Sequence, residues 1–249
     1  MPRGPRLDAP GVVHHVWAHA IDGWDLFLDR DDRRDVVARL SKVLPDGGAG
    51  CFGWTLMSNH VHLVVKTGHQ RLGTLMQRVF TGYAMRFNGR TGRRGHLLQG
   101  RFGSRPLRDE ADLLVVIRYV LRNPLEAGLV RSLEDLERYP WGGLSALLGR
   151  RPPLPFESVS DTLALFAADE ASARSRLRTW MEGSEPAGRP DAPLDALLRQ
   201  VCAELAVLDR ALLCRRAVQA GLGVVDVARA LHLSHAAVSQ AARRSSSDK

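Results

Sequence analysis

The sequence has few cysteines and no long apolar run. Its three cysteines, Cys51, Cys202 and Cys214, form no Cys-x-x-Cys pair, which argues against a zinc ribbon or a thiol redox motif. No stretch approaches the ~20 apolar residues that a membrane-spanning helix needs, and residues 1–6 have no apolar signal core. We therefore expect a cytoplasmic protein in a reducing compartment, without membrane association.

Acidic residues are absent from positions 51–108. Residues 51–110 carry ten lysines and arginines against Asp109 and Glu110, a net charge of +8 that equals the net charge of the whole chain. A solvated basic face usually intersperses charges of both signs. The local excess therefore predicts that this segment binds a polyanion.

Two histidines stand two residues apart at the head of an apolar run, in Asn59-His60-Val61-His62-Leu63-Val64-Val65. In a β-strand, alternate side chains share a face, so His60 and His62 point the same way. Two imidazoles so placed can hold one divalent metal ion, although such a pair also occurs as ordinary surface or hydrogen-bonded core histidines. His14 and His15, on the first predicted strand, could reach the same place or be structural.

Tyrosine is scarce, with only Tyr83, Tyr119 and Tyr139 in the chain. Tyr83 lies in the basic segment on a predicted helix, where it is either part of the apolar stripe or a nucleophile. Tyr119 and Tyr139 are rival nucleophiles in segments whose patterns indicate packing. A metal, a tyrosine and a basic groove together indicate phosphodiester chemistry on nucleic acid.

Apolar periodicity predicts strand, helix, strand, strand, helix, strand, the order of a ferredoxin-like α+β fold with an antiparallel sheet and helices on one face. A hairpin joins the second and third strands at Ser58-Asn59. The basic segment also contains a predicted glycine-rich loop. The predicted elements are residues 12–20, 31–44, 51–57, 60–66, 72–87 and 101–107, followed by a helix at 109–121 that ends before Asn123-Pro124.

Composition changes after residue 148. We predict a nuclease domain at 1–148, a linker with a helical segment at 149–193, and an all-α region at 194–249. Within the last, residues 227–240 resemble a helix-turn-helix, with Ser234 as the cap of the second helix. An ordinary helical hairpin is the alternative for this short motif.

Several ordered motifs resemble single-tyrosine HUH transposases, and in particular the branch of REP-associated tyrosine transposases. The resemblance covers roughly residues 8–148. The chain departs from the family pattern at Val16-Trp17-Ala18-His19, at Trp141-Gly142-Gly143, and in the many acidic residues of 8–46. The matching segments are residues 57–65, 83–88, 95–102, 118–124, 127–130 and 139–141.

The resemblance implies a metal-dependent single-stranded DNA endonuclease and strand transferase, active in DNA transposition. His60 and His62 would bind Mg²⁺ or Mn²⁺, with Asn88 or Gln99 as a third ligand or substrate contact; Asn88 is equally a helix C-cap. Tyr83 would form a 5′-phosphotyrosine, with Arg86 helping the phenol to ionise.

We expect a monomer that binds single-stranded DNA, at repeats that form hairpins, and duplex DNA through its C-terminal region. The alternatives are a domesticated, non-catalytic DNA-binding regulator and a replication-initiator or relaxase-type nuclease; the absence of a P-loop disfavours the latter. The predicted DNA contacts are Lys66, Arg86, Arg90, Arg93, Arg94, Arg101 and Arg105 in the nuclease domain, and Ser239, Gln240, Arg243 and Arg244 in the helix-turn-helix.

Overall fold

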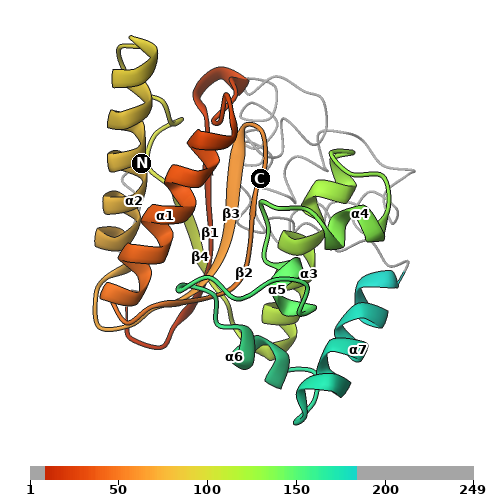
Figure 1. Ribbon diagram of the computed structural model, residues 1–249. Helices are drawn as coiled ribbons and strands as arrows, with labels where there is room; N and C mark the ends of the chain where they lie inside the picture. Colours follow the sequence, from red (N-terminus) through yellow and green to blue (C-terminus); the bar gives the residue numbers. More distant parts are fainter. Residues whose placement is uncertain (1–8, 184–249) are drawn as a thin grey trace, which may run out of the picture. The chain divides into compact units, whose positions relative to one another are not determined.

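The computed structural model describes residues 9–183 (Figure 1). The predicted helix-turn-helix, with Ser239, Gln240, Arg243 and Arg244, lies outside the described residues. The elements are β1 (Val13–His19), η1 (Ile21–Gly23), α1 (Arg30–Asp46), β2 (Gly50–Leu56), β3 (His60–Lys66), α2 (Leu72–Thr91), β4 (Gly103–Pro106), α3 (Glu110–Glu126), α4 (Leu133–Glu137), α5 (Leu144–Leu147), α6 (Val159–Ala164) and α7 (Glu170–Glu182).

The four strands form one sheet in the order β2-β3-β1-β4, and every neighbouring pair is antiparallel. This order, with α1 between β1 and β2 and α2 between β3 and β4, is the ferredoxin-like arrangement that the sequence predicts. The predicted hairpin between β2 and β3 is also present. The α+β class and the topology are therefore confirmed.

Helices cover both faces of the sheet, not one (Figure 1). Val16, Leu63 and Val65 share a core with α1 and α2, whereas Phe52 and Val64 share a second core with α3 and α5–α7. The prediction of helices on one face was wrong in this respect. The reason is that β2 and β3 are apolar at consecutive positions, so both of their faces need cover from water.

Helix α3 continues through the predicted break at Asn123-Pro124 and ends at Glu126. A proline disfavours helical backbone at the residue before it, which is why the sequence indicated an earlier end. Here the proline lies in the last turn, and its carbonyl accepts a hydrogen bond from the backbone N–H of Leu129 at 2.8 Å. Asn123 is consequently helical and lies one turn beyond Tyr119.

Helix α2 also runs further than predicted, to Thr91. Gly92 follows with φ +68°, a left-handed conformation that glycine adopts without steric cost and that ends the helix. Asn88 is thus an internal residue of α2. Its predicted alternative role as a helix C-cap is wrong.

The described part of the predicted linker, residues 149–183, packs against the ferredoxin-like fold. Leu163, Leu177 and Met181 are buried in the second core, and Glu157 accepts a hydrogen bond from the Trp54 indole at 2.7 Å. All described residues belong to one compact unit, which does not end at residue 148. Within residues 9–183, no helix has the length and apolar character needed to cross a membrane.

Candidate active site

Five aromatic rings lie together on the α3 face of the sheet. Strand pairing places His19 opposite His60 and Trp17 opposite His62, and directly opposed residues of antiparallel strands point to the same face. His15 lies two residues before Trp17 on β1 and so shares that face. The predicted pairing of His60 and His62 on one face follows from this register, and their ring centres are 4.9 Å apart.

His60 is held between two asparagines. Its Nδ1 lies 2.7 Å from the side-chain oxygen of Asn59. In the tautomer protonated at Nδ1, this nitrogen donates to the Asn59 oxygen and Nε2 carries a lone pair. Nε2 in turn lies 3.4 Å from Asn123 Oδ1, on α3.

His62 contacts a histidine on one side and a tyrosine on the other. Its Nδ1 lies 3.0 Å from His15 Nε2, and its Nε2 lies 3.4 Å from the Tyr119 hydroxyl. The rings of His62 and Tyr119 meet edge to face with centres 5.2 Å apart. Helix α3 therefore contributes both Tyr119 and, four residues later, Asn123.

The site is deep on its α3 side and open at the end of the strands. His15, His62 and Tyr119 are buried, whereas His60 is half-buried and His19 is exposed. The exposed His19 ring stacks on His60 with centres 5.0 Å apart. A ligand would approach from this end.

The donor atoms suit a divalent metal ion. Among residues 9–183, no group of three His, Cys, Asp or Glu side chains is placed to hold a metal. His60 Nε2 and Asn123 Oδ1, however, lie 3.4 Å apart, and His62 points its own Nε2 toward the same helix. Asn59 and His15 orient the histidine rings through Nδ1, as outer-shell partners of ligating histidines do.

Tyr83, the nucleophile predicted from the sequence, is not at this site. It lies on α2 in the core of the opposite sheet face, fully buried, and its hydroxyl donates a hydrogen bond to the Leu26 carbonyl. Burial, with a further contribution from the nearby Asp32 carboxylate, raises the pKa of Tyr83 above its usual value. The geometry thus contradicts this assignment and supports the alternative for Tyr83, a core tyrosine.

The two candidates for a third ligand lie apart from each other. Asn88 is on α2, where its side-chain N–H donates to the Gly95 carbonyl at 2.8 Å. Gln99 is exposed, and its backbone N–H donates to the His19 carbonyl at 3.0 Å, so it lies beside the open end of the site. The structure brings neither side chain to His60, where Asn123 lies instead.

Several predicted DNA contacts are engaged with carboxylates. Arg86 and Arg90 on α2 form ion pairs with α1: Arg86 lies 3.7 Å from Asp32, and Arg90 lies 2.6 Å from the same carboxylate. The acidic residues of 8–46 thus offset part of the basic segment. Arg86 has a structural partner there in place of its predicted role in ionising Tyr83.

The remaining predicted DNA contacts differ in whether their side chains already have a partner within the protein. Arg105 is bound to Asp112 at 2.7 Å, and Arg93 lies over the exposed Trp24 ring at 5.4 Å. No ion pair within residues 9–183 involves the exposed set, which is Lys66, Arg94 and Arg101.

Sequence reasoning named Tyr119 only as a rival nucleophile in a segment that indicates packing, and it took Asn123 for the end of a helix. Their separation of four residues is the available signal, because residues i and i+4 lie on the same side of a helix. His15 was recognised as able to reach the site, and it does so. His14 points to the other face, since it alternates with His15 along β1.

Comparison with known proteins supports the fold. No protein-family model and no curated protein matches the sequence. A solved structure of a REP-associated tyrosine transposase bound to a REP hairpin matches with a TM-score of 0.51 at 15% sequence identity, over 68% of this chain and 93% of that one. The chain therefore has the fold of a protein in the family that its motifs resemble.

Proposed function

We propose that the protein is a metal-dependent single-stranded DNA endonuclease and strand transferase in which Tyr119, not Tyr83, is the nucleophile. One observation carries the proposal: α3 presents Tyr119 3.4 Å from His62 and Asn123 3.4 Å from His60. A nucleophile and a set of metal-binding donors thereby converge at one place. Such convergence of chemically distinct groups in a partly open site is what phosphodiester cleavage requires.

Tyr119 would attack the scissile phosphorus through its phenolic oxygen. The new bond joins that oxygen to phosphorus, and the bond between phosphorus and the 3′ oxygen breaks. Tyr119 gives up its proton, and the departing 3′ oxygen takes one up to become a free hydroxyl. The product is a 5′-phosphotyrosine, which is itself a phosphodiester, so attack by a 3′-hydroxyl can displace the tyrosine and rejoin strands.

His60, His62 and Asn123 would hold the metal ion through Nε2, Nε2 and Oδ1. A bound Mg²⁺ or Mn²⁺ would offset negative charge on the non-bridging phosphate oxygens. Imidazole ligands favour Mn²⁺ over Mg²⁺, which prefers oxygen. Asn59 and His15 would keep the two imidazoles in the neutral tautomer and orientation that binding needs.

The substrate would be single-stranded DNA beside a hairpin. Tyr119 and His62 are buried beneath α3, so the scissile phosphate would have to come close to the protein core, which suits a strand free of its complement. The similar transposase is described as bound to a REP hairpin. The exposed Lys66, Arg94 and Arg101 would contact phosphates.

The cellular setting is a further part of the proposal. We infer that the protein acts as a monomer in the cytoplasm, and that residues 194–249, outside the described part, add contacts to duplex DNA. DNA transposition is the process that this chemistry would serve.

The test is a matched pair of tyrosine variants. Hairpin-bearing single-stranded oligonucleotides with random flanks are incubated with wild type, Tyr119→Phe or Tyr83→Phe, with Mn²⁺ or Mg²⁺ and with EDTA. We expect a metal-dependent covalent protein–DNA adduct in wild type and Tyr83→Phe, and its loss in Tyr119→Phe. Adducts are detected by denaturing gel and located by peptide mass spectrometry.

Two outcomes would count against the proposal. An adduct that persists in Tyr119→Phe and disappears in Tyr83→Phe would return the nucleophile to α2. Binding of the same oligonucleotides without any adduct, unaffected by EDTA or by either variant, would favour the non-catalytic regulator.

A further inference from the structure

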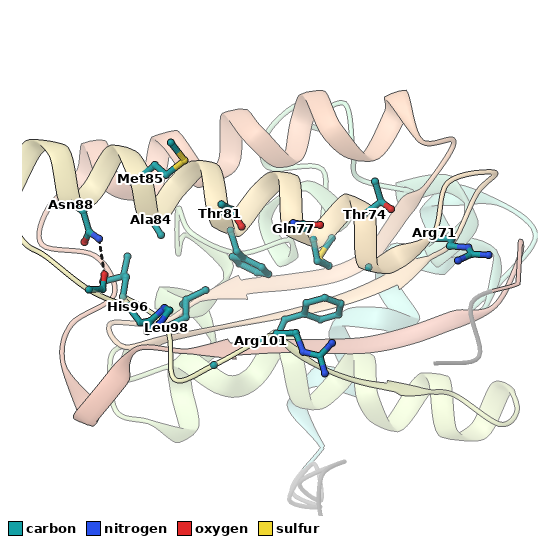
Figure 2. Close-up of a pocket in the computed structure, with 17 residues that line it drawn as sticks. Arg71, Thr74, Gln77, Thr81, Ala84, Met85, Asn88, His96, Leu98 and Arg101 are labelled. Atoms are coloured by element: carbon teal, nitrogen blue, oxygen red, sulfur yellow. Dashed lines mark hydrogen bonds between the residues drawn. The ribbon is translucent and has the colours of Figure 1, made fainter. Parts of the chain in front are cut away.

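A cavity of about 850 Å³ lies between α2 and the segment 95–102 that leads into β4. Figure 2 shows α2 along one side, with Asn88 near one end and Arg71 near the other, and Leu98 and Arg101 across from the helix. We call it the α2 groove. It is distinct from the histidine site, because α2 packs on the sheet face away from α3.

The chemistry of the α2 groove suits an anion with flat apolar parts. No carboxylate is among its lining residues, and it includes the arginines Arg71 and Arg101. Phe80, Leu98 and Phe102 add apolar surface. An unpaired nucleotide combines these features, since it has a charged phosphate and a base with two apolar faces.

Polar groups that could read the edge of a base also line the groove. Gln77 and Thr81 extend from α2, and both are exposed. A side-chain amide and a hydroxyl can each donate and accept hydrogen bonds. The cavity volume falls within the range of ~300–1,000 Å³ that ligand pockets occupy.

One wall of the groove is attached to the histidine site. Leu98 forms an isolated bridge with Ala20, directly after β1. The adjacent Gln99 donates its backbone N–H to the His19 carbonyl, and His19 stacks on His60. A DNA strand that leaves the histidine site beside His19 would therefore meet the exposed Gln99, which is adjacent to the groove-lining Leu98.

We propose that the α2 groove binds unpaired nucleotides of the single-stranded substrate and so helps to select the position of cleavage. This inference rests on the proposed function, because it takes the same DNA strand as the ligand of both sites. Arg101 and Arg71 contact phosphates, and the bases lie against the apolar surface that α2 and Phe102 provide.

Binding is measured in the Tyr119→Phe background, so that no cleavage occurs. The probes are fluorescein-labelled dT12 and the same strand paired with dA12. Thr81→Trp, which fills the groove, and Arg101→Ala, which removes a charge, are compared with Thr91→Trp and Arg78→Ala on the same helix, both outside the groove. We expect Thr81→Trp to weaken dT12 binding about tenfold, because the indole occupies the space in which a base would otherwise stack. Binding of the duplex should be unchanged.

A second measurement locates the bound strand directly. 5-Iododeoxyuridine is placed at successive positions of the single strand, irradiated in complex with the Tyr119→Phe protein, and the crosslinked peptides are identified. We expect crosslinks to residues of α2 and of the segment 96–102. This readout does not depend on whether the groove variants fold.

The two proposals fail in different ways. If the groove variants bind dT12 within twofold of their controls and no crosslink maps to the groove, this inference is overturned even if wild type cleaves DNA. Equal weakening of duplex and single-strand binding would also overturn it. If the groove effects and crosslinks appear but wild type forms no adduct, the groove stands and the nuclease proposal fails.

Discussion

At the scale of single residues, chemically identical side chains differ in the groups that their polar atoms contact. Tyr83 is closed in by apolar neighbours, and its hydroxyl is committed to the Leu26 carbonyl. Tyr119 is also buried but faces His62. The two asparagines Asn88 and Asn123 divide in the same way, one bound to a loop carbonyl and one facing His60.

The asparagines provide a prediction about metal dependence. We expect Asn123→Ala to lower the rate of adduct formation about 10–100-fold at low Mn²⁺ and to be partly rescued at high Mn²⁺, because it removes a donor from the proposed metal site. Asn88→Ala, which also removes an amide, should leave the metal dependence unchanged. The measurement is the initial rate of adduct formation against Mn²⁺ concentration.

An equal rate loss in both variants at every Mn²⁺ concentration would contradict this assignment. Circular dichroism of the two proteins controls for loss of fold, since Asn123 is 8% exposed and lies inside α3.

At the scale of elements, an ion pair anchors the helix that carries Tyr119 and Asn123. Arg105 on β4 donates two hydrogen bonds to Asp112 in the first turn of α3, at 2.7 and 2.9 Å. The Asp112 carboxylate also accepts the backbone N–H of Arg108 at 3.1 Å. Because Asp112 is seven residues before Tyr119, two helical turns, this anchor sets the placement of Tyr119 along the sheet.

The anchor predicts a dependence of stability on pH. Hydrogen bonds from Arg105, opposed by burial, lower the pKa of Asp112 from 3.8 to about 2. A lowered folded-state pKa stabilises the protein above the unfolded pKa, and the benefit is lost as pH falls from about 4 to about 2. We expect wild type to exceed Asp112→Asn by about 2 kcal/mol at neutral pH.

Urea unfolding of both proteins between pH 7 and pH 2 measures this difference. A gap that stays constant below pH 4 would show that the carboxylate charge is not its source. Asp135→Asn, in the first turn of the short helix α4, is a control at a comparable helix position.

At the scale of the whole molecule, the segment 149–183 completes the second core of the fold. Arg118 and Arg122 on α3 donate hydrogen bonds to the carbonyls of Gly183 and Met181 at the end of α7. Buried Glu137 on α4 is paired with Arg178 of α7 at 2.8 Å. Helix α3 is therefore held from behind by residues that the sequence assigned to a linker.

This packing predicts where the chain can be shortened. We expect a chain of residues 1–148 to lose cooperative unfolding and to bind a hydrophobic dye, because removing α6 and α7 exposes the second core. A chain of residues 1–187 should unfold cooperatively. Thermal unfolding and dye fluorescence of the two chains test this, and a stable, cooperative 1–148 fragment would restore the boundary predicted from the sequence.

The fold was largely predictable because its signals are local. Alternating and continuous apolar runs indicated the strands, and the turn at Ser58-Asn59 indicated the hairpin. The histidine pair on one face needed only the two-residue period of a strand. Helices on the second face were missed because a short apolar strand does not reveal how many of its faces are covered.

The sequence by itself determined the α+β class, the ferredoxin-like order of strands and helices, and the placement of His60 and His62 on one face of a strand. Only the tertiary structure decided which tyrosine meets them, because Tyr83 and Tyr119 lie on similar amphipathic helices and differ in the sheet face that each helix covers. The continuation of α3 through Pro124 likewise depends on its packing, and it brings Asn123 to His60. Contacts between residues distant in sequence, such as Tyr119 with His62, arise only when the sheet and its helices assemble.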